Sequence, residues 1–191
     1  MNEIQPVKIH SAKYRIENIV ISVSFHSEIN LEKIAANYQD ADFNLNKFPG
    51  LCIRITKPKC TLLLFKNGKM IITGLKNSSE APLVVKRVSE KLAHVGIELD
   101  TKPEFKIVNL VVSLNFQHRI NLDDASLSLN HSIYEPEVFP GLIFRNLTPI
   151  TCVFLIFSSG KVVLTGLKQE DDIIPAIKLL GAQLKKKGIL D

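Results

Sequence analysis

The chain contains one pattern of residues twice, and this repetition limits its possible folds more than any other feature. Phe48-Pro49-Gly50-Leu51 is followed by Gly68-Lys69 and by Thr73-Gly74-Leu75-Lys76, and the same three motifs recur from Phe139, Gly160 and Thr165. The second copy lies 91 residues further on up to Pro149 and 92 residues further on after it, so it carries one inserted residue. Repetition on this scale predicts two copies of one supersecondary unit, related by a pseudo-twofold axis.

The composition is that of an ordinary globular protein with a modest basic excess. The 191 residues are 46% hydrophobic and 23% charged, and the net charge is +5. We expect neither a signal peptide nor a membrane-spanning segment, because no window has about 18 uncharged apolar residues. Five scattered histidines without metal-ligand spacing predict no metal site, and we expect no cofactor. The three cysteines lie in apolar runs without CxxC spacing, which favours buried, reduced thiols: Cys52, Cys60 and Cys152.

Each copy has the pattern of a strand, a helix, three strands and a second helix. Alternating apolar residues and turn signals predict strands at 15–25, 51–56, 60–66 and 69–73, with helices at 30–36 and 78–95. In the second copy the strands are expected at 105–115, 142–147, 151–157 and 161–165, with helices at 121–129 and 171–187. We expect Asn30 to cap the first helix, and Ser78 or Ser79 to cap the helix that Gly96 ends. The predicted units are residues 1–100 and 101–191, joined in one continuous antiparallel sheet.

Several of the predicted strands are apolar on both sides. Leu62 and Leu64 lie on one side of a strand and Leu63 and Phe65 on the other, because successive side chains alternate. Two helices per copy can cover only one side of the sheet, so the second apolar side has no partner within the chain. Uncovered apolar surfaces of this size indicate an interaction site, or else a face covered by dimerisation. Duplex DNA is the commonest ligand with the matching near-twofold symmetry.

The repeated motifs resemble those of the TATA-box-binding protein family. The resemblance rests on Phe-Pro-Gly-Leu-x-x-Arg, on Gly-Lys-x-x-x-Thr-Gly-x-Lys and on Asn18 and Asn109, each of which begins an apolar strand segment. It extends from about Arg15 to the end of the last helix, and Tyr134-Glu135-Pro136-Glu137-Val138 is especially close to the family's second repeat. The resemblance implies an α+β saddle, which is a curved ten-stranded antiparallel sheet with helices on its convex face.

The resemblance also implies that the concave face binds the minor groove of an A·T-rich, TATA-like promoter. Proteins of this family are themselves an established example of side chains that wedge between base steps and kink DNA. The residues that match the wedges are Phe48, Phe65, Phe139 and Phe157. Those that match base contacts are Asn18, Val20, Pro49, Leu63, Ile71, Thr73, Asn109, Val111, Pro140, Leu155, Val163 and Thr165. Those expected at phosphates are Arg54, Lys69, Lys76, Arg145, Lys161 and Lys168, and six such contacts predict a salt slope of roughly −5.

The two copies differ in the loop before Phe-Pro-Gly. The second copy has Glu135, Glu137 and Val138, whereas the first has Asn44 and Asn46 at the positions of the two glutamates. In the family, this acidic loop binds transcription factor B, which recruits RNA polymerase. The expected partners are therefore double-stranded DNA, transcription factor B and, indirectly, RNA polymerase, with no membrane and no small-molecule substrate.

Proline after the wedge phenylalanine and the lack of a low-complexity extension are typical of archaeal members of the family. An archaeal protein of this kind would lie in the cytoplasm or nucleoid, and a eukaryotic one in the nucleus. Two alternatives to a general initiation factor remain open. One is a divergent paralogue that binds proteins and engages DNA weakly. The other is an enzyme with an accessory saddle, which is disfavoured because the chain has no nucleophile–base pair, carboxylate pair or phosphate-binding loop.

Three departures from the family pattern motivate the paralogue alternative. Glu17 and Val108 precede the two asparagines, where the family usually has glutamine. The chain has Lys185-Lys186-Lys187 near its end, where archaeal relatives are often acidic. The residue inserted after Pro149 could bulge the strand that follows and redirect Leu155 or Phe157.

Overall fold

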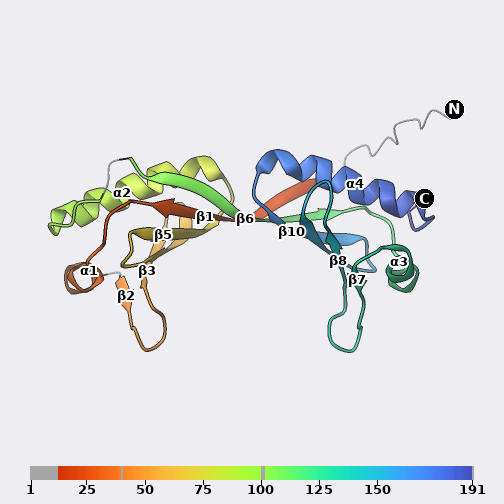
Figure 1. The fold of residues 1–191 in the computed structure, drawn as a ribbon, viewed down its shortest axis with the longest axis horizontal. Coiled ribbons are helices and arrows are strands. Elements are labelled where there is room, and N and C mark those ends of the chain that lie inside the picture. Colours follow the sequence, from red (N-terminus) through yellow and green to blue (C-terminus); the bar gives the residue numbers. More distant parts are fainter. Residues whose placement is uncertain (1–12, 40, 100–101, 191) are drawn as a thin grey trace. The chain divides into compact units, whose positions relative to one another are not determined.

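The protein is described by a computed structural model that covers residues 13–39, 41–99 and 102–190 (Figure 1). Both copies have the same order of elements. The first copy consists of β1 (Tyr14–Ser24), α1 (Leu31–Asn37), β2 (Ala41–Phe43), β3 (Leu51–Thr56), β4 (Lys59–Leu64), β5 (Lys69–Leu75), a 3₁₀ turn (Ser78–Glu80) and α2 (Ala81–His94). The second consists of β6 (Glu104–Asn115), α3 (Leu122–Ser128), β7 (Ser132–Ile133), β8 (Leu142–Asn146), β9 (Cys152–Ile156), β10 (Lys161–Leu167), a 3₁₀ turn (Glu170–Asp172) and α4 (Ile173–Lys186).

The described strands form a ten-stranded sheet in the order β2-β3-β4-β5-β1-β6-β10-β9-β8-β7. Within each half the pairings between neighbouring strands are antiparallel, as expected. By its internal contacts the described chain divides into one unit of residues 17–109 and another of residues 13–16 with 110–190. The division falls within β1 and β6 rather than at the predicted boundary near residue 100, where Asp100 and Thr101 lie outside the described residues.

The strands and helices expected from the sequence are present, with ends that differ by up to two or three residues. Asn30 caps α1 as predicted, since its side chain accepts a hydrogen bond from the main-chain N–H of Lys33 at 2.8 Å. The predicted serine cap of the long helix is wrong. A 3₁₀ turn precedes α2, and the side chain of Asn77 caps that turn by accepting from the N–H of Ser79. Sequence periodicity alone also missed β2 and β7, which have only three and two residues.

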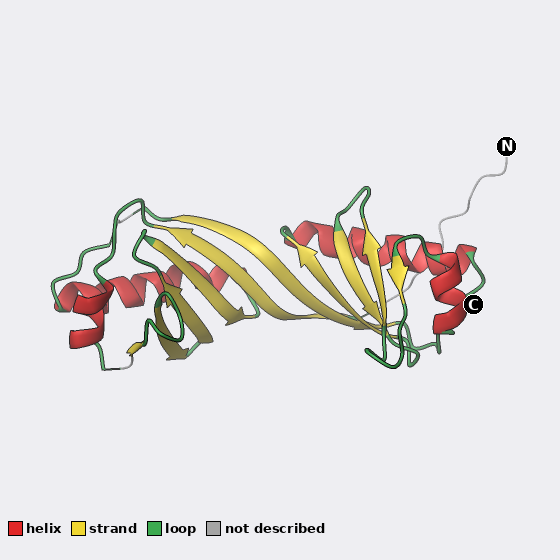
Figure 2. Cartoon of the chain, turned by 60° about the horizontal axis from the view of Figure 1, so that its bottom comes forward, coloured by secondary structure: helices red, strands yellow, loops and turns green. Residues whose placement is uncertain are grey.

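In each half the long helix packs along one face of the strands (Figure 2). The apolar residues of α2 recur at helical spacing and are buried: Ala81, Val84, Val85, Val88 and Leu92. They cover the buried strand residues Ile19, Leu62, Leu64, Met70 and Ile72. The second half has the equivalent arrangement, with Ile173, Ala176, Ile177, Leu180 and Leu184 of α4 buried over the side of the sheet that carries Phe154, Ile156, Val162 and Leu164. One side of each half is therefore a packed core, as the alternation predicts.

The inserted residue lengthens the loop between β8 and β9, which are each one residue shorter than β3 and β4, and leaves the register of the remaining pairs unchanged. In the first half Thr56 pairs with Lys59 across Lys57-Pro58, whereas in the second half the last pair is Asn146 with Cys152. Leu155 pairs with Val163, just as Leu63 pairs with Ile71, so the expectation that the insertion could redirect Leu155 is wrong.

Asn146 holds this longer loop in place. It is 4% exposed, and its side-chain amide donates to the carbonyl oxygens of Thr148 at 3.2 Å and Ile150 at 2.5 Å. The equivalent residue of the first half is Ile55, which has no such loop to support. A buried amide has thus replaced an apolar residue at the place where extra main chain needs hydrogen-bond donors.

We predict that Asn146→Ala lowers the free energy of unfolding by about 1–3 kcal/mol, because two carbonyl oxygens lose their buried donor. Asn37→Ala is the control, since the amide of Asn37 donates to the carbonyl of Lys33 at an exposed position and its loss should cost less than about 0.5 kcal/mol. Urea denaturation followed by circular dichroism measures both values. Equal stability of the two variants would show that the loop does not depend on Asn146.

Candidate nucleic-acid interface

The face opposite the helices carries continuous rows of side chains in the first half, and most of these side chains are half-buried. Paired residues of neighbouring antiparallel strands lie on the same face. The pairs Cys52–Leu63, Leu63–Ile71 and Ile71–Ser22 join β3, β4, β5 and β1 in one row. A second row contains Arg54, Thr61 and Thr73. We call this surface the open face of the first half, because no described helix covers it.

The second half has an equivalent open face. Ile143–Leu155, Leu155–Val163 and Val163–Ser113 form the first row across β8, β9, β10 and β6. Arg145, Val153, Thr165 and Val111 form the second row. All the predicted base-contacting residues on strands are half-buried, in contrast to the fully buried residues that alternate with them: Asn18, Val20, Leu63, Ile71, Thr73, Asn109, Val111, Leu155, Val163 and Thr165.

Asn18 is held in a fixed orientation by a β-bulge in the neighbouring strand. The pairing of β1 with β5 is irregular between Ile19 and Ile21, opposite Gly74, whose φ is +99°. The main-chain N–H of Gly74 donates to Oδ1 of Asn18 at 2.7 Å, and Nδ2 of Asn18 lies 3.2 Å from Oγ1 of Thr73. Because a main-chain N–H can only donate, the side-chain oxygen of Asn18 faces the bulge and its NH₂ group has a further hydrogen available for a ligand.

Two pairs of phenylalanines lie at equivalent positions in the two halves. The ring centroids of Phe48 and Phe65 are 5.6 Å apart at an interplanar angle of 62°, and those of Phe139 and Phe157 are 5.8 Å apart at 63°. These are edge-to-face contacts, which are favourable for aromatic rings. All four rings are half-buried, and Pro49 and Pro140 beside them are exposed. The structure thus brings together each pair of predicted wedges.

The glycine of each Phe-Pro-Gly motif is needed for this arrangement. A β-carbon at Gly50 would lie 2.8 Å from Cε1 of Phe48 and 2.7 Å from the carbonyl oxygen of Leu64. A β-carbon at Gly141 would lie 2.8 Å from Cε1 of Phe139 and 3.0 Å from Cε1 of Phe157. Any larger residue would therefore push the paired rings from their positions.

The loops that precede the two motifs have the same main-chain turn and different side chains. The carbonyl oxygen of Asn44 accepts from the N–H groups of Lys47 and Phe48, and that of Glu135 accepts from Val138 and Phe139. The side chains of Glu135 and Glu137 are exposed, and Val138 is 80% exposed. The predicted partner-binding residues therefore lie together on one projecting loop.

All six predicted phosphate-binding residues are exposed: Arg54, Lys69, Lys76, Arg145, Lys161 and Lys168. Two of them, in the first half, have acidic neighbours. Nη1 of Arg54 lies 3.8 Å from Asp42, and Nζ of Lys76 lies 3.4 Å from Glu17. The second half has Ile133 and Val108 at the positions of those two carboxylates. A phosphate would have to compete with a weak surface ion pair in the first half.

A hollow of about 730 Å³ adjoins Phe157 of the second phenylalanine pair, and its lining includes residues that sequence reasoning missed. Besides Phe157, Lys161 and Val163, it is lined by Tyr14 and Arg15 of β1. Tyr14 is 41% exposed, and so is Phe105, the aromatic residue at the equivalent position of the other copy. This repeated aromatic position is the signal that could have identified Tyr14 from the sequence.

The three cysteines are free thiols, and they differ in exposure. Cys60 and Cys152 are buried as predicted, whereas Cys52 is half-buried on the open face beside Leu63, so the prediction of three buried thiols is wrong for Cys52. Burial, and secondarily the charge of Asp172, raises the pKa of the Cys152 thiol to about 11. Burial and then Glu80 also raise the pKa of Cys60.

Within the described part of the chain, no group of histidine, cysteine and acidic residues is arranged to hold a metal ion. No helix among the described residues is long and apolar enough to cross a membrane.

The fold and the repeated open face together define a two-repeat β-sheet protein, and comparison with known proteins identifies its class. The family described as transcription factor TFIID (or TATA-binding protein, TBP) matches residues 13–95 and 104–187. The chain belongs to the TATA-box-binding protein family. Members of this family are transcription initiation factors that bind DNA, and they are not enzymes.

Archaeal proteins are among its relatives. The TATA-box-binding protein of Pyrobaculum islandicum is 44% identical over 177 residues, which cover 93% of this chain and 88% of the relative. That of Aeropyrum pernix is also 44% identical, over 90% of this chain and 84% of the relative. The solved structure of Methanococcus jannaschii TBP matches with a TM-score of 0.84 and 40% identity, over 91% of this chain and 99% of that one. The expected family fold is thereby confirmed.

We predict that N-ethylmaleimide at pH 8 modifies Cys52 in the folded protein much faster than Cys60 or Cys152. Both buried thiols have raised pKa values, so little reactive thiolate is present at that pH, and their burial also blocks the reagent. Mass spectrometry of peptides after timed quenching measures the three rates, and all three should become similar in denaturant. Rapid modification of Cys152 in the folded chain would contradict the arrangement of the two faces.

Proposed function

We propose that this protein binds the minor groove of an A·T-rich, TATA-like promoter element with its open faces, and so initiates assembly of the transcription machinery. The observation that carries the proposal is the repeated open face, on which apolar side chains surround a few hydrogen-bond donors and end at a phenylalanine pair. Relatives at 44% identity are named for TATA-box binding, which supports the same ligand here.

The chemistry of the open face favours A·T pairs. In the minor groove an A·T pair presents only acceptors, whereas a G·C pair adds the donor amino group of guanine. The NH₂ group of Asn18, oriented by Gly74, supplies a donor to those acceptors. Leu63, Ile71, Leu155 and Val163 have no acceptor for a guanine amino group, so a G·C pair would bury an unpaired donor.

The phenylalanine pairs are suited to opening the DNA at each end of the site. Each ring is held at its edge by its partner ring and lies over a glycine that cannot be replaced without a clash. A rigidly held apolar wedge can insert between two base pairs, and the wider contact with a bent duplex offsets the lost stacking. The exposed cations around the open faces would then contact phosphates, and Arg54 and Lys76 would exchange their carboxylate partners for them.

The acidic loop of the second half is the proposed binding site for transcription factor B. Glu135, Glu137 and Val138 are exposed on a turn that also orients Phe139. The uncharged Asn44 and Asn46 occupy the same turn in the first half. Charge at only one of two similar loops would let a basic partner bind one end, which gives a near-twofold complex a direction.

We predict that the wild-type chain binds a TATA-containing duplex more tightly than a G·C-substituted duplex, and that Phe139→Ala and Phe157→Ala each weaken the TATA complex by about tenfold or more. The loss follows from removing a ring that stacks on a base step. Mobility-shift titrations at several salt concentrations measure the affinities, and energy transfer between dyes at the ends of the duplex measures bending.

Leu127→Ala is the control, because Leu127 is 89% exposed on α3 and lies away from the open face. N-ethylmaleimide provides a further check, since TATA DNA should protect Cys52 on the open face from modification. Equal, weak binding of both duplexes that the phenylalanine variants leave unchanged would refute the proposal and favour the protein-binding paralogue.

We predict that Glu135→Arg combined with Glu137→Arg preserves binding to TATA DNA and weakens recruitment of archaeal transcription factor B by about tenfold. The variant replaces two attractive charges with repulsive ones on a loop outside the open face. Supershift titration of the preformed DNA complex measures recruitment. The matched control is Asn44→Arg with Asn46→Arg on the equivalent loop, which should leave recruitment unchanged, and equal effects of both variants would reject this assignment.

A further inference from the structure

Two predicted phosphate-binding residues of the first half lie against carboxylates of the protein itself. Nη1 of Arg54 is 3.8 Å from Oδ2 of Asp42, and Nζ of Lys76 is 3.4 Å from Oε2 of Glu17. Each pair joins a positive and a negative side chain, so its net charge is close to zero. A phosphate that approaches either cation therefore also approaches a negative charge, and the pair neutralises less of the phosphate charge than a cation alone.

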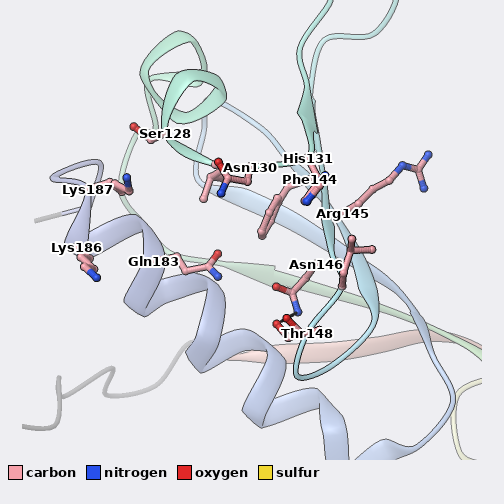
Figure 3. Close-up of a pocket in the computed structure, with 12 residues that line it drawn as sticks. Ser128, Asn130, His131, Phe144, Arg145, Asn146, Thr148, Gln183, Lys186 and Lys187 are labelled. Atoms are coloured by element: carbon pink, nitrogen blue, oxygen red, sulfur yellow. Dashed lines mark hydrogen bonds between the residues drawn. The ribbon is translucent and has the colours of Figure 1, made fainter.

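The second copy keeps both cations, as Arg145 and Lys168. Its residues at the positions of the two carboxylates are apolar: Ile133 and Val108. The side chain of Arg145 extends from β8 away from α4 (Figure 3). This direction agrees with its place in the second row of the open face. The cations of the second half therefore face a ligand without a carboxylate at these positions.

A third position has opposite charge in the two copies. Residues 13–16 belong to the unit of the second half, and residues 104–109 belong to that of the first. In the first half Oε1 of Glu104 lies 3.6 Å from Nε2 of His26. The residue equivalent to Glu104 is Lys13, which lines the hollow beside Phe157 in the second half. The described lining of that hollow contains cations and no carboxylate: Lys13, Arg15 and Lys161.

We propose that the second half holds the DNA backbone more strongly than the first half, and that Lys13 and Arg15 are further phosphate-binding residues there. This inference rests on the proposed binding of DNA by the open faces, and the hollow is continuous with the open face through Phe157, Lys161 and Val163. At three equivalent positions the first half has three carboxylates, whereas the second has a lysine and two apolar residues. Because the predicted phosphate-binding cations are alike in both copies, these positions decide how much phosphate charge each half neutralises.

Mobility-shift titrations over a range of salt concentrations test this inference. Each phosphate that a cation neutralises adds about 0.9 to the slope of log affinity against log salt concentration. Arg145→Gln with Lys168→Gln should flatten this slope by about 2, because two unopposed cations are lost. Arg54→Gln with Lys76→Gln should flatten it by less than about 1, because those cations are already opposed by carboxylates.

Lys13→Gln with Arg15→Gln tests the two further phosphate-binding residues and should flatten the slope by about 1–2. The control for the variants that lose two cations is Lys185→Gln with Lys186→Gln. It removes the same charge from exposed residues of α4, which lies on the other side of the strands from the open face. The control should change the slope by less than about 0.5.

Glu17→Gln with Asp42→Asn tests the proposed cause of the difference between the halves. With the carboxylates removed, the slope should steepen by about 1–2 and affinity at low salt should rise by about fivefold. The control is Glu32→Gln with Glu90→Gln, which makes the same charge change at exposed residues of α1 and α2. Glu90 is a matched choice because it also lies near a cation, 3.9 Å from Nζ of Lys86.

Every slope is measured on the TATA-containing and on the G·C-substituted duplex, because phosphate contacts carry no sequence information. Loss of the preference for TATA would refute promoter binding alone, and the slopes would still compare the two halves. Thermal melts establish that each variant is folded. The inference is overturned if the two arginine–lysine variants flatten the slope equally, or if either the Lys13 and Arg15 variant or the carboxylate variant behaves like its control.

Discussion

In each half the helices cover only one face of the strands, and the rest of the structure depends on this constraint. In each half the residues under α2 or α4 are buried, and those that alternate with them along the same strands remain half-buried. Stability therefore comes from one set of side chains, and the other set is available to a ligand. This separation leaves Leu63 and Leu155 free for the proposed DNA-binding surface, while their neighbours Leu62 and Phe154 are buried in the core.

Features set by periodicity could be predicted from the sequence, and features set by local hydrogen bonds could not. The strands and long helices follow from apolar residues at spacings of two and of about 3.6, and the repetition supports each assignment twice. The strands β2 and β7 are too short to show a period. The cap at Asn77 was missed because a 3₁₀ turn moves the start of the helical segment by a few residues. The inserted residue was absorbed by Asn146, a contact that no spacing rule reveals.

The candidate site, too, could be predicted from the sequence only in part. Its residues could be chosen from the repeated motifs, but their orientation required the structure. The amide of Asn18 is fixed by a bulge at Gly74, and Tyr14 joins the hollow beside Phe157 from a distant part of the chain. Cys52 lies on the open face because its strand pairs with Leu63, although its apolar neighbours in sequence favoured burial. Each of these facts depends on which strands are neighbours, and strand order is a property of the whole fold.

Comparison of the two copies also distinguishes functions that both copies share from functions that belong to one copy. The two phenylalanine pairs and their glycines are alike in both copies, as expected if both copies contact the same proposed ligand. Positions that differ cannot serve that ligand symmetrically, and one group of them lies on the loop before Phe139. That loop has Glu135 and Glu137 where the first copy has Asn44 and Asn46. A symmetric DNA-binding surface cannot specify a direction for transcription, so direction must come from such differences.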